Sequence, residues 1–183
     1  YEAYPDMLLT VNWFSPWHDQ PTPPPADRID LISVLIHELT HGLGFNSLLN
    51  TATSPGPGSF TPLDQLIGRA DGTPLVDNTS GFSGSETDLI SGPLAFLGPD
   101  AAAAYGNYPP LYAPDPFLQG TSLQHWDPYQ LNTADAVMIP SYRIGSALRQ
   151  YAPFEAAALR DQGYPSPSSV LPPAWPRGGR PSR

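Results

Sequence analysis

The sequence predicts an α+β fold, and three observations lead to this prediction. Residues 27 to 43 have the apolar pattern of a largely buried helix, and residues 152 to 162 have the pattern of a second one. Residues 7 to 14, MLLTVNWF, have the apolar and aromatic composition of a strand. Pro and Gly occupy 25 and 16 of the 183 positions, so we expect few regular elements and long ordered loops.

The boundaries of these elements follow from capping and turn residues. The long helix is expected to begin at Asp27, with Asp30 three residues later in a capping-box position, and to stop at Gly42 and Gly44. The chain between the two helices is expected to be mostly turns. Within it we expect a short helix or strand at 60–67, a strand at 75–76 and one or two helical turns at 99–105.

Composition excludes several classes of partner. The formal net charge of −9 argues against nucleic acid, and no apolar run approaches the roughly 18 residues of a membrane span. There is no Cys, so neither disulfides nor a Cys-based metal site can form. The length suits one domain over residues 1–165, followed by a Pro- and Arg-rich tail or linker at 166–183. The lack of Cys and the tail favour a secreted, extracellular bacterial product, and the oligomeric state is not indicated.

The segment His37-Glu38-Leu39-Thr40-His41 carries the strongest chemical signal. On a helix, residues four apart lie on one face, so both imidazoles can reach one ion. Glu38 projects beside them and can hold and deprotonate a water molecule that zinc makes more acidic. The alternative is that these are ordinary helix residues. Against it, the chain has four His, and two of them stand at ligand spacing around a Glu.

A catalytic zinc ion usually has a third protein ligand. The short extension of the motif would place a His at position 47, where this chain has Ser47. The remaining candidates are His18, His125 and a carboxylate such as Glu155. His125 is favoured, because it lies in the segment SLQHWDP and is followed by AVMIP.

The stretches HELTHGLGF, QHW and AVMIP occur in an order that resembles the metzincin clan of zinc peptidases, and within it the leishmanolysin-like branch and its bacterial relatives. The resemblance covers about residues 29 to 164. It implies that His37, His41 and His125 bind zinc, that Glu38 is the general base, and that Met138 forms the Met-turn beneath the metal. His125 follows His41 by 125 − 41 = 84 residues and precedes Met138 by 13.

The resemblance also implies a metzincin-like α+β fold with a reduced N-terminal sheet, a long active-site helix and an irregular, loop-rich C-terminal part. Only 36 residues precede His37, so either the sheet is reduced or upstream strands are missing from this chain. Some metzincins use a Tyr two residues after the Met as an extra ligand, and this chain has Pro140 there. Tyr142 follows Met138 by four residues, and a packing role is favoured for it.

The predicted function is a zinc-dependent endopeptidase that hydrolyses protein or peptide substrates through a metal-activated water, with Glu38 as general base. One alternative is a thermolysin-like zinc peptidase with a Glu, such as Glu155, as third ligand. Another is a non-catalytic binding module that zinc stabilises. A structural Ca²⁺ ion is a further hypothesis, although EF-hand spacing is absent from the acidic loop residues Asp64, Asp71, Asp77, Glu86 and Asp88.

Overall fold

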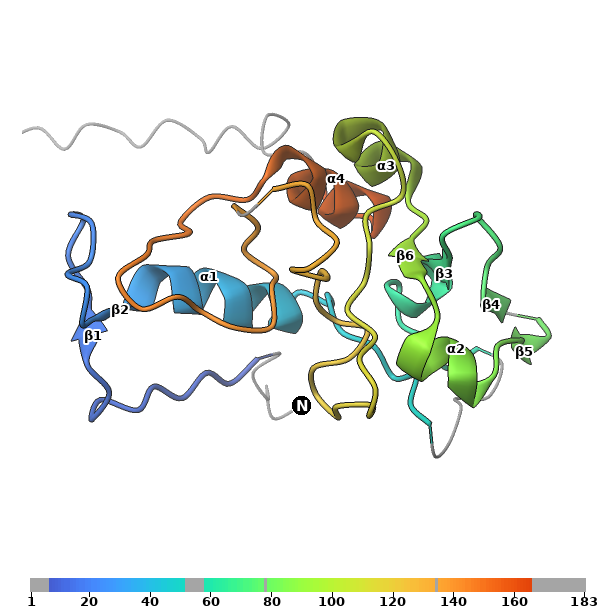
Figure 1. Ribbon diagram of the computed structural model, residues 1–183, viewed down its shortest axis with the longest axis horizontal. Helices are drawn as coiled ribbons and strands as arrows, with labels where there is room; N and C mark the ends of the chain where they lie inside the picture. The colour runs from blue at the N-terminus through green and yellow to red at the C-terminus, as the bar shows by residue number, and fades with distance from the viewer. Residues whose placement is uncertain (1–6, 52–57, 78, 134, 166–183) are drawn as a thin grey trace, which may run out of the picture.

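The computed structural model describes residues 7–51, 58–77, 79–133 and 135–165, and these residues have an α+β architecture (Figure 1). They contain the helices α1 (Leu31–Gly42), α2 (Glu86–Ser91), α3 (Pro99–Tyr105) and α4 (Pro153–Asp161), and the 3-10 helix η1 (Asp64–Leu66). The strands are β1 (Trp17–His18), β2 (Ile29–Asp30), β3 (Ile67–Arg69), β4 (Val76–Asp77), β5 (Gly81–Phe82) and β6 (Leu94–Phe96). The predicted α+β class is therefore confirmed, while the tail at 166–183 lies outside the described residues.

The strands form three separate two-stranded sheets in the described part of the chain. β1 and β2 pair in parallel, whereas β3–β6 and β4–β5 are antiparallel. In Figure 1, α1 and the β1–β2 pair occupy one end of the molecule, and β3 to β6 with α2 occupy the other. Sheets of this size have little stability of their own, so the fold depends on packing between segments.

Helix α1 begins four residues later than the sequence indicated. Its N-cap is Asp30, whose carboxylate accepts a hydrogen bond from the Ser33 N–H at 2.9 Å. The expected cap at Asp27 is wrong, because Ile29 and Asp30 are extended and pair with β1. The predicted end is confirmed at Gly42, and Gly44 then adopts a φ of +108°, which favours glycine.

The segment at 7–14 is not a strand, contrary to the prediction. Residues 7 to 12 have no regular structure, and Trp13 and Phe14 form an exposed turn. The segment instead lies along α1, where residues 9 to 12 and α1 side chains such as Leu31 and Leu35 line a groove of about 270 Å³. Most of its apolar side chains are nevertheless exposed, among them Leu8, Trp13 and Phe14, so the apolar pattern did not indicate burial. A strand would need a paired edge, which the described chain does not supply here.

Helices α3 and α4 pack against each other, and both were predicted at nearly these residues (Figure 1). The Asp161 carboxylate, at the end of α4, accepts hydrogen bonds from the N–H groups of Asp100 and Ala101 at 3.0 and 2.9 Å. Negative charge at a helix N-terminus is favourable, so this contact ties the end of α4 to the start of α3. The expected helix or strand at 60–67 is a 3-10 turn followed by the start of β3.

Trp126 lies at the centre of the core and is 0% exposed. Its ring contacts those of Phe45, Phe96 and Phe154, with centroid separations of 4.9, 5.8 and 5.1 Å. These partners come from the loop that follows α1, from β6 and from α4. One side chain therefore joins the otherwise separate elements around the segment that carries His125.

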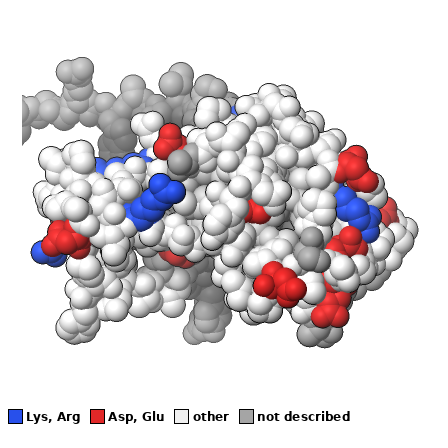
Figure 2. Space-filling view, viewed as in Figure 1, with Lys and Arg blue, Asp and Glu red and all other residues white. Residues whose placement is uncertain are grey.

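Charged side chains are sparse on the face shown in Figure 2, and acidic groups gather towards the end that carries α2 and β3 to β5. This distribution agrees with the charged fraction of 14% and the net charge of −9. Across the described residues, no helix has the length and apolar character required to cross a membrane.

Candidate metal centre

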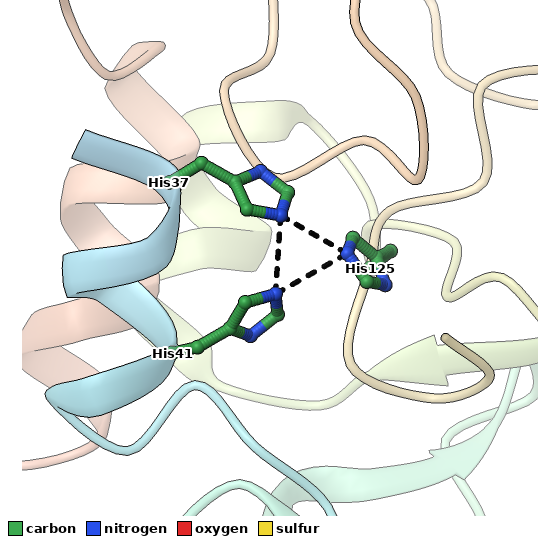
Figure 3. A group of neighbouring side chains, drawn as sticks. All are labelled: His37, His41 and His125. Atoms are coloured by element: carbon green, nitrogen blue, oxygen red, sulfur yellow. Dashed lines mark hydrogen bonds between the residues drawn. The ribbon is translucent and has the colours of Figure 1, made fainter. Parts of the chain in front are cut away.

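Three histidines from two distant parts of the chain meet at one point (Figure 3). His37 and His41 project from successive turns of α1, and His125 comes from the loop that leads to Trp126. The Nε2 atoms of His37 and His41 are 3.1 Å apart. His125 Nε2 lies 3.2 Å from that of His37 and 3.3 Å from that of His41. These three residues are the predicted ligand set, and we refer to them as the three-His group.

The far nitrogen of each ring is held by a backbone carbonyl. The Nδ1 atoms of His37, His41 and His125 lie 2.9, 2.8 and 2.7 Å from the carbonyl oxygens of Val137, Phe45 and Thr121. A carbonyl oxygen can only accept, so each Nδ1 carries a proton in the neutral ring and each Nε2 keeps its lone pair. Three lone pairs then face one another across about 3.2 Å, and a cation placed between them removes their repulsion.

The spacing fits a first-row transition metal. In a tetrahedral site with bonds of about 2.0–2.1 Å, two ligand nitrogens are about 3.3–3.4 Å apart. The observed 3.1 to 3.3 Å is close to this value, so a small outward adjustment of the rings is sufficient. Imidazole ligands suit zinc and also copper, iron or nickel. The group can therefore hold a metal ion, and its geometry alone does not select zinc.

Burial keeps the imidazoles of His37 and His125 neutral. It lowers the pKa of His125 to about 4. The hydrogen bond to the Thr121 carbonyl acts in the opposite direction and has the smaller effect on this pKa. Burial also lowers the pKa of His37, against the bond to Val137. Neutral imidazole is the form that binds metal, so both rings are ready for an ion at neutral pH.

Glu155 is not part of the three-His group. It is 2% exposed, and its carboxylate accepts hydrogen bonds from four N–H groups: Trp126 Nε1 at 3.0 Å, Val137 N at 3.0 Å, Met138 N at 2.8 Å and Ala152 N at 2.9 Å. The sequence indicated it only as an alternative ligand and missed this role. The available signal was its place as the third residue of a helix that begins with Pro153, where a Glu turns back towards the N-cap.

Glu38 and Tyr142 lie beside the three-His group. Glu38 is exposed on α1, next to His37 in the sequence. The Tyr142 ring packs edge-on against His37, with centroids 5.0 Å apart, so this side chain reaches the three-His group and its packing role stays a prediction. Its hydroxyl is buried and has no hydrogen-bond partner among the described residues. Burial raises the pKa of that hydroxyl, and the nearby charge of Glu38 raises it further.

Two other sequence candidates have different surroundings. Met138 is buried in the core, and its carbonyl oxygen accepts the Trp126 N–H at 2.7 Å. Its role as the floor of the metal site remains a prediction. His18, the other histidine considered as a third ligand, lies outside the group, and its Nε2 is 2.8 Å from the carbonyl oxygen of Thr22.

The acidic loop residues do not support the calcium hypothesis. Among the described residues, the side chains of the three-His group lie close enough together to share a metal ion. The carboxylates of the acidic loop residues do not form such a cluster. The carboxylates of Asp64, Asp71, Asp77 and Asp88 already accept hydrogen bonds from nearby donors.

Comparison of the chain with protein-family models, curated proteins and solved structures gives no match. The resemblance to metzincins therefore rests on the residues themselves, and the function must be argued from the site.

Proposed function

We propose that this chain is a zinc-dependent endopeptidase of the metzincin type, with His37, His41 and His125 as ligands. The observation that carries the proposal is the convergence of three Nε2 atoms whose Nδ1 atoms are all anchored to backbone carbonyls. Such anchoring fixes both the tautomer and the direction of each ligand, which is typical of metal-binding histidines.

Glu38, which lies between the ligands His37 and His41 in the sequence, favours a catalytic site over a purely structural one. A zinc ion held by three imidazoles acts as a Lewis acid that can activate water and polarise a carbonyl group. Glu38 is exposed on α1 and its charge acts on His37 and Tyr142, so we expect its carboxylate to accept a proton from the attacking water and pass it to the departing amine. A structural zinc site has no need of such a base.

Peptides are the substrate class that fits this chemistry. The acidic chain is unsuited to nucleic acid, and hydrolysis by a metal, a water and a carboxylate is the reaction of the H-E-x-x-H peptidases. The metzincin-like details remain part of the proposal, as do the role of Met138 as the Met-turn and secretion from a bacterium.

The test combines metal content with hydrolysis. We expect one zinc ion per wild-type chain and cleavage of casein or quenched-fluorescence peptides that stops with a chelator and returns with zinc. Glu38→Gln should keep its zinc but lose about 10²–10⁴-fold in kcat/KM, the range for a positioned proton acceptor. Glu86→Gln, an exposed substitution on α2, is the matched control and should leave activity unchanged.

Two results would contradict parts of the proposal. Near-normal hydrolysis by Glu38→Gln would mean that another group is the base. One zinc ion per chain with no hydrolysis of any peptide in a broad library would favour the non-catalytic binding module instead.

A further inference from the structure

A buried carboxylate lies one peptide group away from the three-His group. The Val137 carbonyl oxygen accepts the Nδ1–H of His37 at 2.9 Å, and the Met138 N–H donates to Glu155 Oε1 at 2.8 Å. That C=O and that N–H belong to the same peptide group, between residues 137 and 138. A continuous path of two hydrogen bonds therefore leads from the His37 ring to the Glu155 carboxylate.

The surroundings of Glu155 favour its charged form. All four of its hydrogen-bond partners are N–H groups, which can only donate. A carboxylate accepts from all of them, whereas a carboxylic acid would need an acceptor for its own proton. Burial raises the pKa of Glu155, and the four donors act in the opposite direction because they stabilise the charge.

We propose that Glu155 is a positioning residue that strengthens His37 as a metal ligand through the peptide between Val137 and Met138. A negative charge on the N–H side of a peptide draws that proton towards itself and increases the negative charge on the carbonyl oxygen. The oxygen then attracts the Nδ1 proton of His37 more strongly, which shifts electron density towards Nε2. In many metal sites a carboxylate contacts the ligating His directly, and here a peptide carries the same effect.

This arrangement differs between His37 and His125, which provides an internal control. The Nδ1–H of His125 donates to the Thr121 carbonyl, and the N–H of the same peptide, from Ser122, donates to the Leu118 carbonyl at 2.8 Å. That path ends on a neutral group. Removal of the Glu155 charge should therefore change His37 more than His125, which Glu155 reaches only through the indole N–H of the neighbouring Trp126. A general loosening of the core would change both to a similar extent.

The inference rests on the metal-binding half of the proposed function and does not require peptide hydrolysis. The test uses the full chain loaded with zinc and the variant Glu155→Gln, which keeps the size of the side chain, removes its charge and replaces one of its two accepting oxygens with an NH2 donor. Nitrogen-edited NMR reports the Nδ1–H resonances of His37 and His125, and competition with a chromophoric chelator gives the zinc Kd. Asp64→Asn is the matched control, because Asp64 is also fully buried but bonds to residues 47, 48 and 61.

We expect the His37 Nδ1–H resonance to move upfield in Glu155→Gln, with a clearly smaller movement of the His125 resonance. The zinc Kd should rise about tenfold, at the lower end of the 10–100-fold losses typical of groups that support metal ligands. Asp64→Asn should match the wild type in both measurements. Unchanged His37 resonance and Kd in folded Glu155→Gln, or equal movement of both histidine resonances, would overturn the inference.

A measurement on the wild type covers the case in which Glu155→Gln does not fold. A scalar coupling across the hydrogen bond from the Met138 nitrogen to the Glu155 carboxyl carbon supports the relay, and its absence from the folded, zinc-loaded protein overturns it. Failure of the two proposals can also be separated. A wild-type chain that binds zinc and shows the coupling but hydrolyses no peptide supports the relay and contradicts the peptidase, and a chain that binds no zinc contradicts both.

Discussion

Acid should destabilise the metal-free protein through His125. The pKa of this imidazole is about 4 in the folded chain because it is buried, against an ordinary value of 6.5. Between these two values the unfolded state binds a proton that the folded state does not, so stability falls as the pH decreases from about 6.5 to 4. Above pH 6.5 both states are neutral and the contribution of His125 to stability is complete.

The size of this effect follows from the two pKa values. At about 1.4 kcal/mol per pKa unit, the difference between 6.5 and 4 corresponds to about 3 kcal/mol, and most of it is lost by pH 4.5. His37 acts in the same direction, because burial lowers its pKa as well. With a urea m value of about 2 kcal/mol/M, a loss of 3 kcal/mol lowers the unfolding midpoint by about 1.5 M.

The assay is urea unfolding at pH 7 and pH 4.5 in excess chelator, for the wild type and for His125→Gln. The variant lacks the titrating group. The difference between its unfolding midpoints at pH 7 and pH 4.5 should therefore be about 1.5 M smaller than that of the wild type. Other groups that titrate in this range are common to both proteins and cancel in the comparison. Equal pH dependence of the two proteins would refute the claim that His125 is buried and neutral in the metal-free fold.

Two further predictions concern stability. Free zinc at 100 times its Kd should stabilise the fold by about 2.7 kcal/mol and raise Tm by about 5–10 °C, because the ion links α1 to a loop 84 residues away. Calorimetry should show no such rise for His125→Ala, and a full rise in that variant would contradict the ligand assignment. Trp126→Ala should cost about 3–5 kcal/mol, since it empties the centre of the core and removes a donor to Glu155. Trp13→Ala, at a site 71% exposed, should cost less than about 0.5 kcal/mol, and similar losses in both variants would contradict the core assignment.

The sequence predicted best where a local signal controls the structure. α3 and α4 each have Pro in the first turn and a following Gly, at 106 and 163, with positive φ, and both were expected at nearly the observed residues. The start of α1 was misjudged because Asp27 and Asp30 are equally good caps in sequence. Asp30 is the cap because β1 holds Ile29 and Asp30 extended and because Arg149, 119 residues away, pairs with its carboxylate.

The three-His group also has one part that local sequence predicts and one part that depends on distant contacts. The four-residue spacing of His37 and His41 on a helix places both imidazoles on one face, so two ligands and the neighbouring Glu38 follow from the sequence alone. No spacing rule places His125 beside them. Its position depends on Trp126 in the core and on the main-chain bond from Trp126 to Met138. Glu155 was recognised as a candidate, but its role depends on donors from three separate segments.

The physical reason is the range of the interactions involved. Helix periodicity, caps and turn residues act within a few positions, so the chain by itself determined helix α1, with two imidazoles on one face and a carboxylate next to them in the sequence. Hydrogen bonds and burial between residues about 20 to 120 positions apart have no counterpart in local sequence. Only the tertiary structure decided that a third imidazole completes the group, and that a buried carboxylate lies one peptide group away from it.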